Sequence, residues 1–181
     1  MRARLFTITR DGAGRLSTMR HPAGGSALGG EMRRLGTLGV DTLVSMLTER
    51  EAARLGLGAE PTCAESYGMS FVACPVHDHG VPHTSVAELL ALRLARALED
   101  DGHVVIHCRQ GIGRSSLLAA ATLTVEGIDA GEAWRKVEQA RGCSVPETRL
   151  QRQWLTSFVA ARSAPAASPG AQLEDPLRSK S

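Results

Sequence analysis

Residues 104–116 read Val104-Val105-Ile106-His107-Cys108-Arg109-Gln110-Gly111-Ile112-Gly113-Arg114-Ser115-Ser116. The apolar, β-branched start favours a strand, and the leucines and alanines that follow at 117–121 favour a helix. The loop between them can direct its N–H groups into one small space, at the positive end of the helix dipole. We therefore expect a strand, a loop and a helix that together bind a phosphate or another oxyanion.

Two side chains give this loop a chemistry that a simple phosphate cradle lacks. Cys108 would face N–H donors and an arginine, so we expect it to be a thiolate, the nucleophilic form, at neutral pH. Arg114 follows after five residues and can bind two oxygens of a tetrahedral anion. Gly111 and Gly113 allow the backbone to approach the ligand closely, and Ser115 could donate a hydrogen bond to the sulfur. The Gly-Lys-Ser/Thr ending of a Walker loop is absent, which disfavours nucleotide binding of that kind.

At these positions the sequence resembles the cysteine-dependent protein tyrosine phosphatase superfamily, whose signature is His-Cys, five residues, Arg, then Ser or Thr. The matching residues are His107, Cys108, Gly111, Gly113, Arg114 and Ser115. The resemblance implies two-step phosphoester hydrolysis through a cysteinyl phosphate, with Cys108, Arg114 and Ser115 as catalytic residues and His107 supporting them. It implies phosphate binding by Arg109, Gln110, Gly111, Ile112, Gly113 and Arg114. We expect no metal and no cofactor, because the arginine and the loop dipoles supply the positive field.

A proton donor for the leaving oxygen should lie in a loop near the nucleophile. Asp78 is the best candidate, because Pro75-x-x-Asp78-x-Gly80-x-Pro82 resembles the acid loop of the kinase-associated phosphatase type of dual-specificity enzyme. After protonating the leaving oxygen, Asp78 would act as a base and help water release the phosphate. The alternative is a turn aspartate that caps its own loop. The weaker candidates for the acid are Asp41, Asp100 and Asp101.

The histidines around this loop, His77, His79 and His83, could ligate a metal, but no familiar ligand pattern accompanies them. We therefore predict a solvated loop without a metal, in which His79 is a second possible proton donor. The resemblance also covers Val145 to Gln151, where a family glutamine positions the hydrolytic water. Gln151 is preferred over Gln153 for this role, and a solvated helix residue is the alternative.

The composition fits one enzyme domain. A chain of 181 residues with 43% hydrophobic residues can bury a single sizeable core. The net charge of +2 is too small to indicate nucleic acid or a membrane surface. The sequence has no apolar run long enough for a membrane span and no apolar signal-peptide core, so we expect a cytoplasmic protein.

Strands expected at 4–9, 40–47, 69–74 and 104–108 alternate with helices, which predicts a single α/β domain over 1–162. Its sheet should be central, mostly parallel and twisted, with helices on both faces, as in a dual-specificity phosphatase. The tail 163–181 is rich in Ala, Pro and Ser and is predicted to be disordered.

Finer signals concern the helix ends. Ser85 and Glu88 have the form of a capping box. The buried stripe of that helix is expected to consist of Val86, Leu89, Leu90, Leu94, Ala97 and Leu98. Pro146 is expected to open the last helix, with Leu150, Trp154, Leu155 and Phe158 on its buried face.

The four cysteines, Cys63, Cys74, Cys108 and Cys143, lack the paired spacing of a metal site. Cys74 ends an apolar run, which favours a small buried hydrophobic side chain. The alternative is that Cys74 lies near Cys108 and traps it as a reversible disulfide under oxidation, as happens in some members of the superfamily.

The sequence therefore predicts a monomeric tyrosine or dual-specificity protein phosphatase. Its partner would be a phosphorylated protein carrying phosphotyrosine, and a shallow site would also accept phosphoserine and phosphothreonine; no nucleic acid or membrane partner is expected. The alternatives are a phosphatase of phosphoinositides or RNA 5′-phosphates, a sulfurtransferase or arsenate-reductase-like thiolate enzyme, and a catalytically silent phosphoprotein-binding module.

Overall fold

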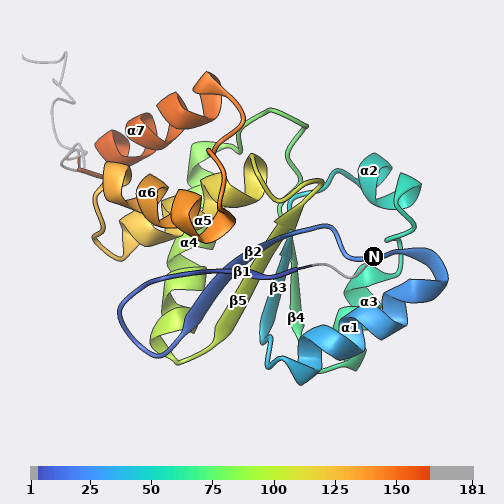
Figure 1. The fold of residues 1–181 in the computed structure, drawn as a ribbon. Helices are drawn as coiled ribbons and strands as arrows, with labels where there is room; N and C mark the ends of the chain where they lie inside the picture. The colour runs from blue at the N-terminus through green and yellow to red at the C-terminus, as the bar shows by residue number, and fades with distance from the viewer. Residues whose placement is uncertain (1–3, 164–181) are drawn as a thin grey trace, which may run out of the picture.

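The structure is a computed structural model that describes residues 4–163. It contains a five-stranded sheet and helices on both sides of it (Figure 1). The strands are β1 (Phe6–Ile8), β2 (Arg15–Arg20), β3 (Thr42–Ser45), β4 (Ser70–Ala73) and β5 (His103–Cys108). The helices are η1 (Gly25–Ala27), α1 (Leu28–Thr37), α2 (Glu49–Arg54), α3 (Glu60–Ser66), α4 (Thr84–Glu99), α5 (Arg114–Val125), α6 (Ala130–Arg141) and α7 (Arg149–Ser163). All but the first residue of the predicted disordered tail lie outside the described residues.

The sheet has the order β1-β2-β5-β3-β4, with β5 at its centre. Only β1 runs antiparallel to its neighbour; the other pairs are parallel. Because parallel strands end at the same edge, the register brings Arg20 of β2 beside Cys108, and Ser45 of β3 beside His107. The predicted fold class, a single α/β domain with a mostly parallel sheet, is confirmed.

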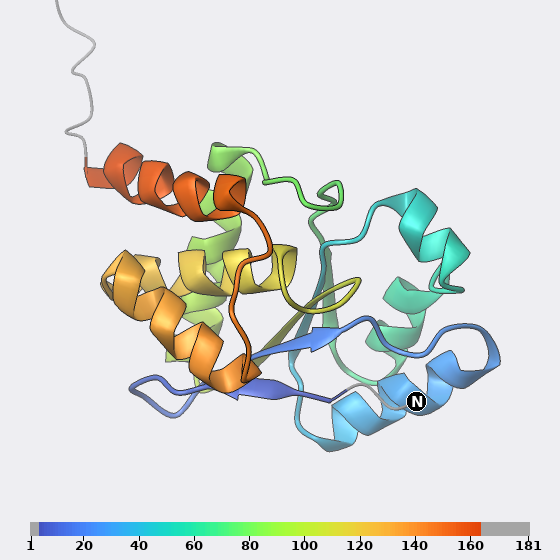
Figure 2. The ribbon, with the colours of Figure 1, turned by 45° about the horizontal axis from the view of Figure 1, so that its top comes forward.

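Side chains of β5 alternate between two separate cores, as the period of a strand requires. Val104, Ile106 and Cys108 belong to the larger core, which also contains residues of α4, α5, α6 and α7. Val105 belongs to the smaller core with residues of α1 and α3. Figure 2 shows the two groups of helices on opposite sides of the sheet. The nucleophile candidate thus lies on the face that packs against α4, α5, α6 and α7.

Helix α5 is the most buried helix of the domain, with residues 114–123 all buried. It contacts α4, α6 and α7 as well as β5. A helix surrounded in this way holds the loop before it in a fixed position. No helix within residues 4–163 has the length and apolar character needed to cross a membrane.

The finer predictions for α4 are partly wrong. The capping box at Ser85 does not form: α4 already begins at Thr84, and the Ser85 hydroxyl lies 2.9 Å from His83 Nδ1. Of the predicted stripe, Leu90, Leu94 and Leu98 are buried as expected, but Val86 and Leu89 are 53% and 72% exposed. Ala87, Ala91 and Ala95 complete the buried stripe.

The last helix also starts later than predicted. Helix α7 begins at Arg149 rather than near Pro146, and the Thr148 hydroxyl accepts a hydrogen bond from the Gln151 N–H at 3.2 Å. Trp154, Leu155 and Phe158 are buried as expected, but Leu150 is exposed. The non-helical segment before Arg149 brings Glu147 close to Gly113 in the loop after β5.

Candidate active site

The loop after β5 wraps around the sulfur of Cys108. The Gly111 N–H donates a hydrogen bond to Cys108 Sγ at 3.3 Å, and the Ser115 hydroxyl lies 3.4 Å from the same atom. The amide N–H is a donor to the sulfur, and the Ser115 hydroxyl can be a second one. Gly113 precedes α5 without any side-chain cap, which leaves the N-terminal N–H groups of α5 for an anion.

Two glycines allow the tight course of this loop. Gly111 has φ +73°, and a Cβ there would lie 2.5 Å from the carbonyl of Met19 on β2. A Cβ on Gly113 would collide with Glu147 and lie 3.1 Å from both polar atoms of the Gln151 amide. Gly111 thus packs against the sheet, and Gly113 packs against the segment that leads into α7.

Arg114, the first residue of α5, is almost fully buried and makes contacts with three segments. Its Nη1 donates to Glu51 Oε2 at 2.8 Å and to the carbonyls of Met46 and Val76 at 3.3 and 2.7 Å. Its Nη2 donates to Glu51 Oε1 at 2.9 Å and to Asp78 Oδ1 at 2.9 Å. Burial alone would lower the pKa of Arg114, but the hydrogen bond with Glu51 and the nearby Cys108 charge raise it. The guanidinium is therefore charged and fixed in orientation.

The Nε of Arg114 remains available in this arrangement. It is buried and has no hydrogen-bond partner among residues 4–163. A buried donor without a partner is costly unless a ligand satisfies it. Since the same residue follows directly after the loop that binds Cys108 Sγ, this donor fits an oxyanion held in the loop.

Glu51 is the site residue that the sequence analysis missed. It is the N3 residue of α2, in a capping box with Thr48: the Thr48 N–H donates to Glu51 Oε2 at 3.0 Å, and Glu51 N–H donates to the Thr48 hydroxyl at 3.3 Å. Burial alone would raise the pKa of Glu51, but the hydrogen bonds from Arg114 and Thr48 hold it at about 2. The pattern Thr-x-x-Glu after a strand was a detectable capping signal, but nothing in the sequence paired it with Arg114.

Asp78 lies where the sequence predicted, in the loop that follows β4. Besides its hydrogen bond to Arg114, its Oδ2 lies 3.9 Å from Nη1 of Arg109, the residue after Cys108. The carboxyl is more than one third exposed, so it can exchange protons with solvent or substrate. The three rival aspartates are elsewhere: Asp41 Oδ2, for example, accepts from the His103 N–H at 2.7 Å, at the opposite end of β5.

Of the other predicted residues, two are buried and two are exposed. Ser115 is buried beside Cys108, and His107 is buried on the opposite face of β5, with its Nε2 3.0 Å from Glu60 Oε1. Arg109 and Gln110 are exposed at the loop surface. The Gln110 carbonyl accepts from Arg141 at 3.4 Å, and the Arg141 guanidinium stacks 3.8 Å from the Phe6 ring.

Gln151 links the last helix to the acid loop. Its Nε2 donates to the Gly80 carbonyl at 3.1 Å, whereas its Oε1 is buried without a partner among the described residues. Both atoms would lie 3.1 Å from a Cβ on Gly113. The amide therefore lies between the phosphate loop and the acid loop.

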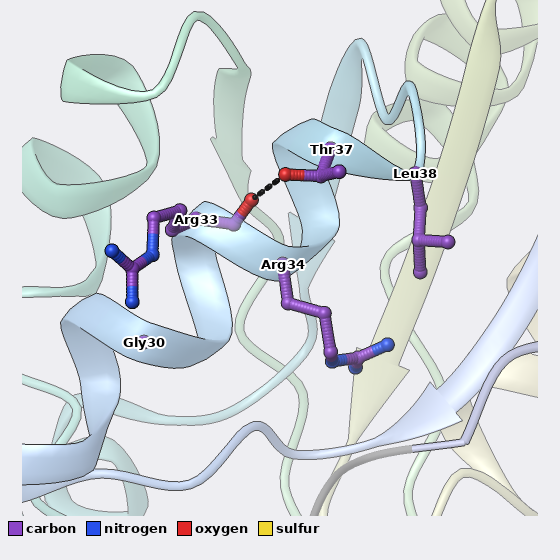
Figure 3. Close-up of a pocket in the computed structure, with 5 residues that line it drawn as sticks. All are labelled: Gly30, Arg33, Arg34, Thr37 and Leu38. Atoms are coloured by element: carbon purple, nitrogen blue, oxygen red, sulfur yellow. Dashed lines mark hydrogen bonds between the residues drawn. The ribbon is translucent and has the colours of Figure 1, made fainter.

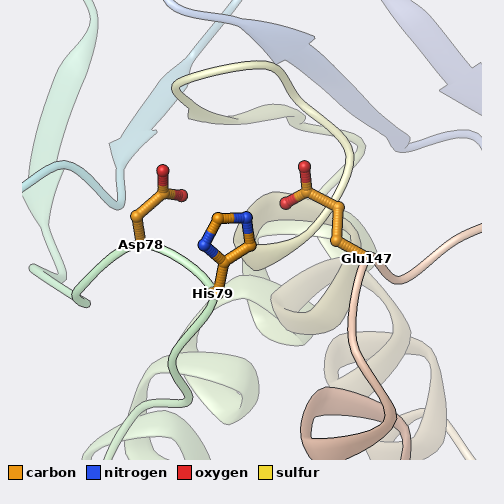
Figure 4. Close-up of side chains that lie close together, drawn as sticks. All are labelled: Asp78, His79 and Glu147. Carbon is orange, nitrogen blue, oxygen red and sulfur yellow. The ribbon is translucent and has the colours of Figure 1, made fainter.

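Two exposed side chains join Asp78 at the entrance of the site. Asp78, His79 and Glu147 each offer one polar atom, and these atoms lie within 4.8 Å of one another (Figure 4). His79 lies in a turn with φ +60°, and its ring lies between the two carboxylates (Figure 4). The predicted histidine trio does not form, because His83 contacts Ser85 instead.

Cys74 follows β4 at its carboxyl end, and β3 separates β4 from β5. Two strand spacings amount to roughly 10 Å, beyond the Cα separation of about 7 Å that a disulfide tolerates. Cys74 is buried, and burial raises the pKa of its thiol. The simpler prediction, a buried hydrophobic side chain, fits this position.

A separate surface pocket lies beside α1. It has a volume of about 290 Å³ and is lined by Gly30, Arg33, Arg34, Thr37 and Leu38 (Figure 3). Leu38 lies just before β3, so the pocket opens near the amino ends of the parallel strands. Cys108 lies at the opposite, carboxyl edge of the sheet, and the pocket takes no part in this site.

Similar solved structures share this fold. Kinase associated phosphatase with its catalytic cysteine changed to serine has a TM-score of 0.80 at 18% identity, over 91% of this chain and 98% of that chain. Tk-PTP in its active form has a TM-score of 0.71 at 23% identity, over 85% and 96%. PTPMT1 in complex with PI(5)P has a TM-score of 0.69 at 21% identity, over 82% and 94%. The fold is therefore that of a compact dual-specificity phosphatase.

Sequence comparison points the same way. Cyclin-dependent kinase inhibitor 3 of Rattus norvegicus is 29% identical over 96 residues, which cover 52% of this chain and 45% of that protein, so the match spans less than half of the curated relative. A family model described as "Polymorphic toxin system, DSP-PTPase phosphatase" matches residues 17–128. That range covers most of the chain and includes the loop from Cys108 to Arg114. The chain belongs to this family of DSP-PTPase phosphatases.

Proposed function

We propose that this protein is a phosphatase of the dual-specificity type, which hydrolyses phosphomonoesters on proteins through a cysteinyl phosphate and needs no cofactor. One observation carries the proposal: the loop that surrounds Cys108 Sγ ends in Arg114, whose buried Nε is the remaining donor of an otherwise saturated guanidinium. A tetrahedral dianion in the loop would satisfy this donor and the free N–H groups of α5.

In the first step the Cys108 thiolate attacks phosphorus in line with the ester oxygen. Arg114 and the N–H groups of residues 109–114 stabilise the charge on the three equatorial oxygens. The phosphate competes with Asp78 for Arg114 Nη2, so Asp78 moves toward the leaving oxygen and protonates it. The products of this step are the free hydroxyl and the S-phosphorylated enzyme.

The substrate we propose is a phosphotyrosine protein, with phosphoserine and phosphothreonine proteins also accepted. The match to cyclin-dependent kinase inhibitor 3 and the fold shared with kinase associated phosphatase support a protein substrate. We further propose that the protein is monomeric and cytoplasmic, and that residues 1–162 form its phosphatase domain. Gln151 is proposed to position the hydrolytic water with its free Oε1.

The test is phosphate release from p-nitrophenyl phosphate without added metal, followed by a panel of phosphopeptides, PI(5)P and a 5′-phosphorylated RNA. Cys108→Ser should abolish release, whereas Cys63→Ser, a change on α3 far from the loop, should leave it intact. A Cys108→Ser protein as active as the wild type would refute the mechanism. Preferential turnover of PI(5)P or RNA would keep the mechanism and replace the substrate.

A further inference from the structure

Three side chains of the kinds that bind metal ions meet at the entrance of the site. One carboxylate oxygen each of Asp78 and Glu147 and one ring nitrogen of His79 lie within 4.8 Å of one another. Figure 4 shows the imidazole ring between the two carboxylates. Asp78 and His79 are neighbours in the loop after β4, whereas Glu147 comes from the segment before α7. Because Glu147 is distant in sequence, the histidines of the loop alone predicted no metal.

The buried amide of Gln151 is directed into the same group. Its side chain is fully buried, and its Oε1 has no partner among residues 4–163. Its Nε2 donates to the carbonyl of Gly80, the residue directly after His79. A Cβ on Gly113 would collide with Glu147 Oε2 and would lie 3.1 Å from Gln151 Oε1, so both oxygens lie beside one point. A buried acceptor without a partner is costly, and a cation held by the three exposed ligands would satisfy it.

The types of ligand favour zinc over the hard cations. Imidazole nitrogen together with carboxylate oxygen is a usual donor set for Zn²⁺, whereas Mg²⁺ and Ca²⁺ prefer oxygen ligands alone. Three atoms at most 4.8 Å apart are roughly 2.8 Å or less from their common centre, so each must move by less than about 1 Å to reach a zinc bond of about 2.1 Å. All three side chains are exposed, so rotation of the side chains can supply this movement.

Arg114 competes with such an ion for Asp78. Arg114 Nη2 lies 2.9 Å from Asp78 Oδ1, and Arg109 Nη1 lies 3.9 Å from Oδ2. In the mechanism proposed above, the bound phosphate takes over Arg114 Nη2 and releases the carboxylate. The released carboxylate can bind a cation, and the dianion in the loop adds negative charge near the entrance. We therefore expect the ion to bind the enzyme–substrate complex as well as the free enzyme.

We propose that Asp78, His79 and Glu147, together with the free oxygen of Gln151, form an inhibitory site for Zn²⁺. The binding of the ion is independent of the reaction, whereas the inhibition rests on the function proposed above. A carboxylate ligates zinc in its ionised form, so Asp78 held by the ion has no proton for the leaving oxygen. The ion also occupies the oxygen of Gln151 that was proposed to position the hydrolytic water. Hydrolysis itself needs no metal, and removal of the ion restores it.

Isothermal titration calorimetry of Zn²⁺ with the full-length Cys108→Ser protein tests the site in the absence of the thiolate, and binding should persist. In this background, Glu147→Gln and His79→Asn should each weaken binding by more than the about 10- to 100-fold that loss of an outer-shell partner costs. Asparagine is chosen at 79 because it tolerates the φ of +60°. The matched controls are His77→Asn in the same loop and Glu65→Gln on α3, both exposed, which should leave binding unchanged.

Steady-state hydrolysis of p-nitrophenyl phosphate measures the inhibition, first in EDTA and then in buffered Zn²⁺. Zinc should lower kcat and not merely raise KM, because saturating substrate does not displace an ion that lies outside the phosphate loop. EDTA should restore the full rate. Relative to each variant's own rate in EDTA, the zinc concentration for half inhibition should rise in Glu147→Gln and His79→Asn. It should stay at the wild-type value in His77→Asn and Glu65→Gln.

Three results would overturn the zinc site and leave the proposed function standing. They are zinc binding that is lost in Cys108→Ser, zinc binding that is undiminished in both Glu147→Gln and His79→Asn, and inhibition that saturating substrate abolishes. A wild type that is inactive in EDTA would refute the proposed function instead. Calorimetry would then still decide whether the ion binds at these residues.

Discussion

Glu51 forms two hydrogen bonds with Arg114, at 2.8 and 2.9 Å, across 63 residues of sequence. Further hydrogen bonds hold both side chains in place: Glu51 through its capping box with Thr48, and Arg114 through the carbonyls of Met46 and Val76. The arginine is therefore charged and oriented before any substrate arrives, which lowers the reorganisation that the reaction requires.

Glu51→Gln tests this pairing. The amide keeps the shape but leaves the buried guanidinium without its counter-charge, so we expect a loss of about 3 kcal/mol in the free energy of unfolding. We also expect a fall of about 10²-fold in kcat/KM, because the phosphate-binding donors lose their orientation. Urea unfolding and steady-state assays measure the two effects. Glu49→Gln, an exposed change two residues earlier, is the control, and equal behaviour of the two variants would contradict the role of Glu51.

The same pair predicts a dependence of stability on pH. The folded-state pKa of Glu51, about 2, is lower than its ordinary value of 4.5, so the ionised form is favoured by folding. Its contribution of about 3 kcal/mol is therefore complete above about pH 5 and is lost as the pH falls toward 2. The difference in unfolding free energy between wild type and Glu51→Gln should shrink over that range. A difference that stays constant from pH 7 to pH 3 would show that the ion pair is not its source.

Asp78→Asn should slow hydrolysis by about 10²–10⁴-fold, the usual range for a lost general acid. The effect should be larger for an alkyl phosphate than for p-nitrophenyl phosphate, since p-nitrophenolate leaves readily without a proton. Steady-state kinetics on both substrates measure this. Asp100→Asn, at the exposed end of α4, serves as the control. A uniform loss on both substrates would indicate binding rather than proton transfer.

Gly111→Ala tests the course of the loop. Its φ of +73° strains any side chain, and the added Cβ would lie 2.5 Å from the Met19 carbonyl. We expect a loss of about 1–3 kcal/mol from strain and overpacking, together with a large loss of activity. Gly127→Ala is the matched control, because its φ is +91° but nothing lies within 4 Å of its Cβ. If Gly111→Ala and Gly127→Ala lower the thermal unfolding temperature equally, the contact of residue 111 with β2 is unimportant.

Peroxide treatment tests the relation between Cys74 and Cys108. Because β3 separates the two strands that carry them, we expect mass spectrometry to find oxidised Cys108 and no peptide joined to Cys74. Cys74→Ala should then leave the rate of peroxide inactivation unchanged. A peptide linking the two cysteines would show that the edge of the sheet opens far enough for them to meet.

The parts of the site that could be predicted are those whose signals lie close together in the sequence. The run from Val104 to Ser116 carries its own strand, turn and helix signals, so the nucleophile loop could be located without a structure. Asp78 followed from its position after a strand end. Glu51 could not be found in this way, because its partner is 63 residues away and only the packing of α2 against the sheet edge brings them together. Glu147 was missed because Pro146 was expected to begin the helix, which would have placed Glu147 inside it.

The buried stripe of α4 could be predicted only in part. Its sequence has apolar residues on more than one face, and periodicity located Leu90, Leu94 and Leu98 but also included Val86 and Leu89, which are exposed. Helical periodicity alone does not decide which neighbouring positions complete the stripe. Packing against the rest of the domain decides it.

The many contacts of Arg114 matter for anyone who wishes to capture the natural target. A protein that binds its phosphorylated partner without releasing it is a useful bait, and the choice of the disabling change decides whether the bait stays intact. Replacing Arg114 would remove the support of β3, α2 and the loop after β4 together. Cys108→Ser leaves that framework in place, so it is the variant with which to isolate the cellular substrate.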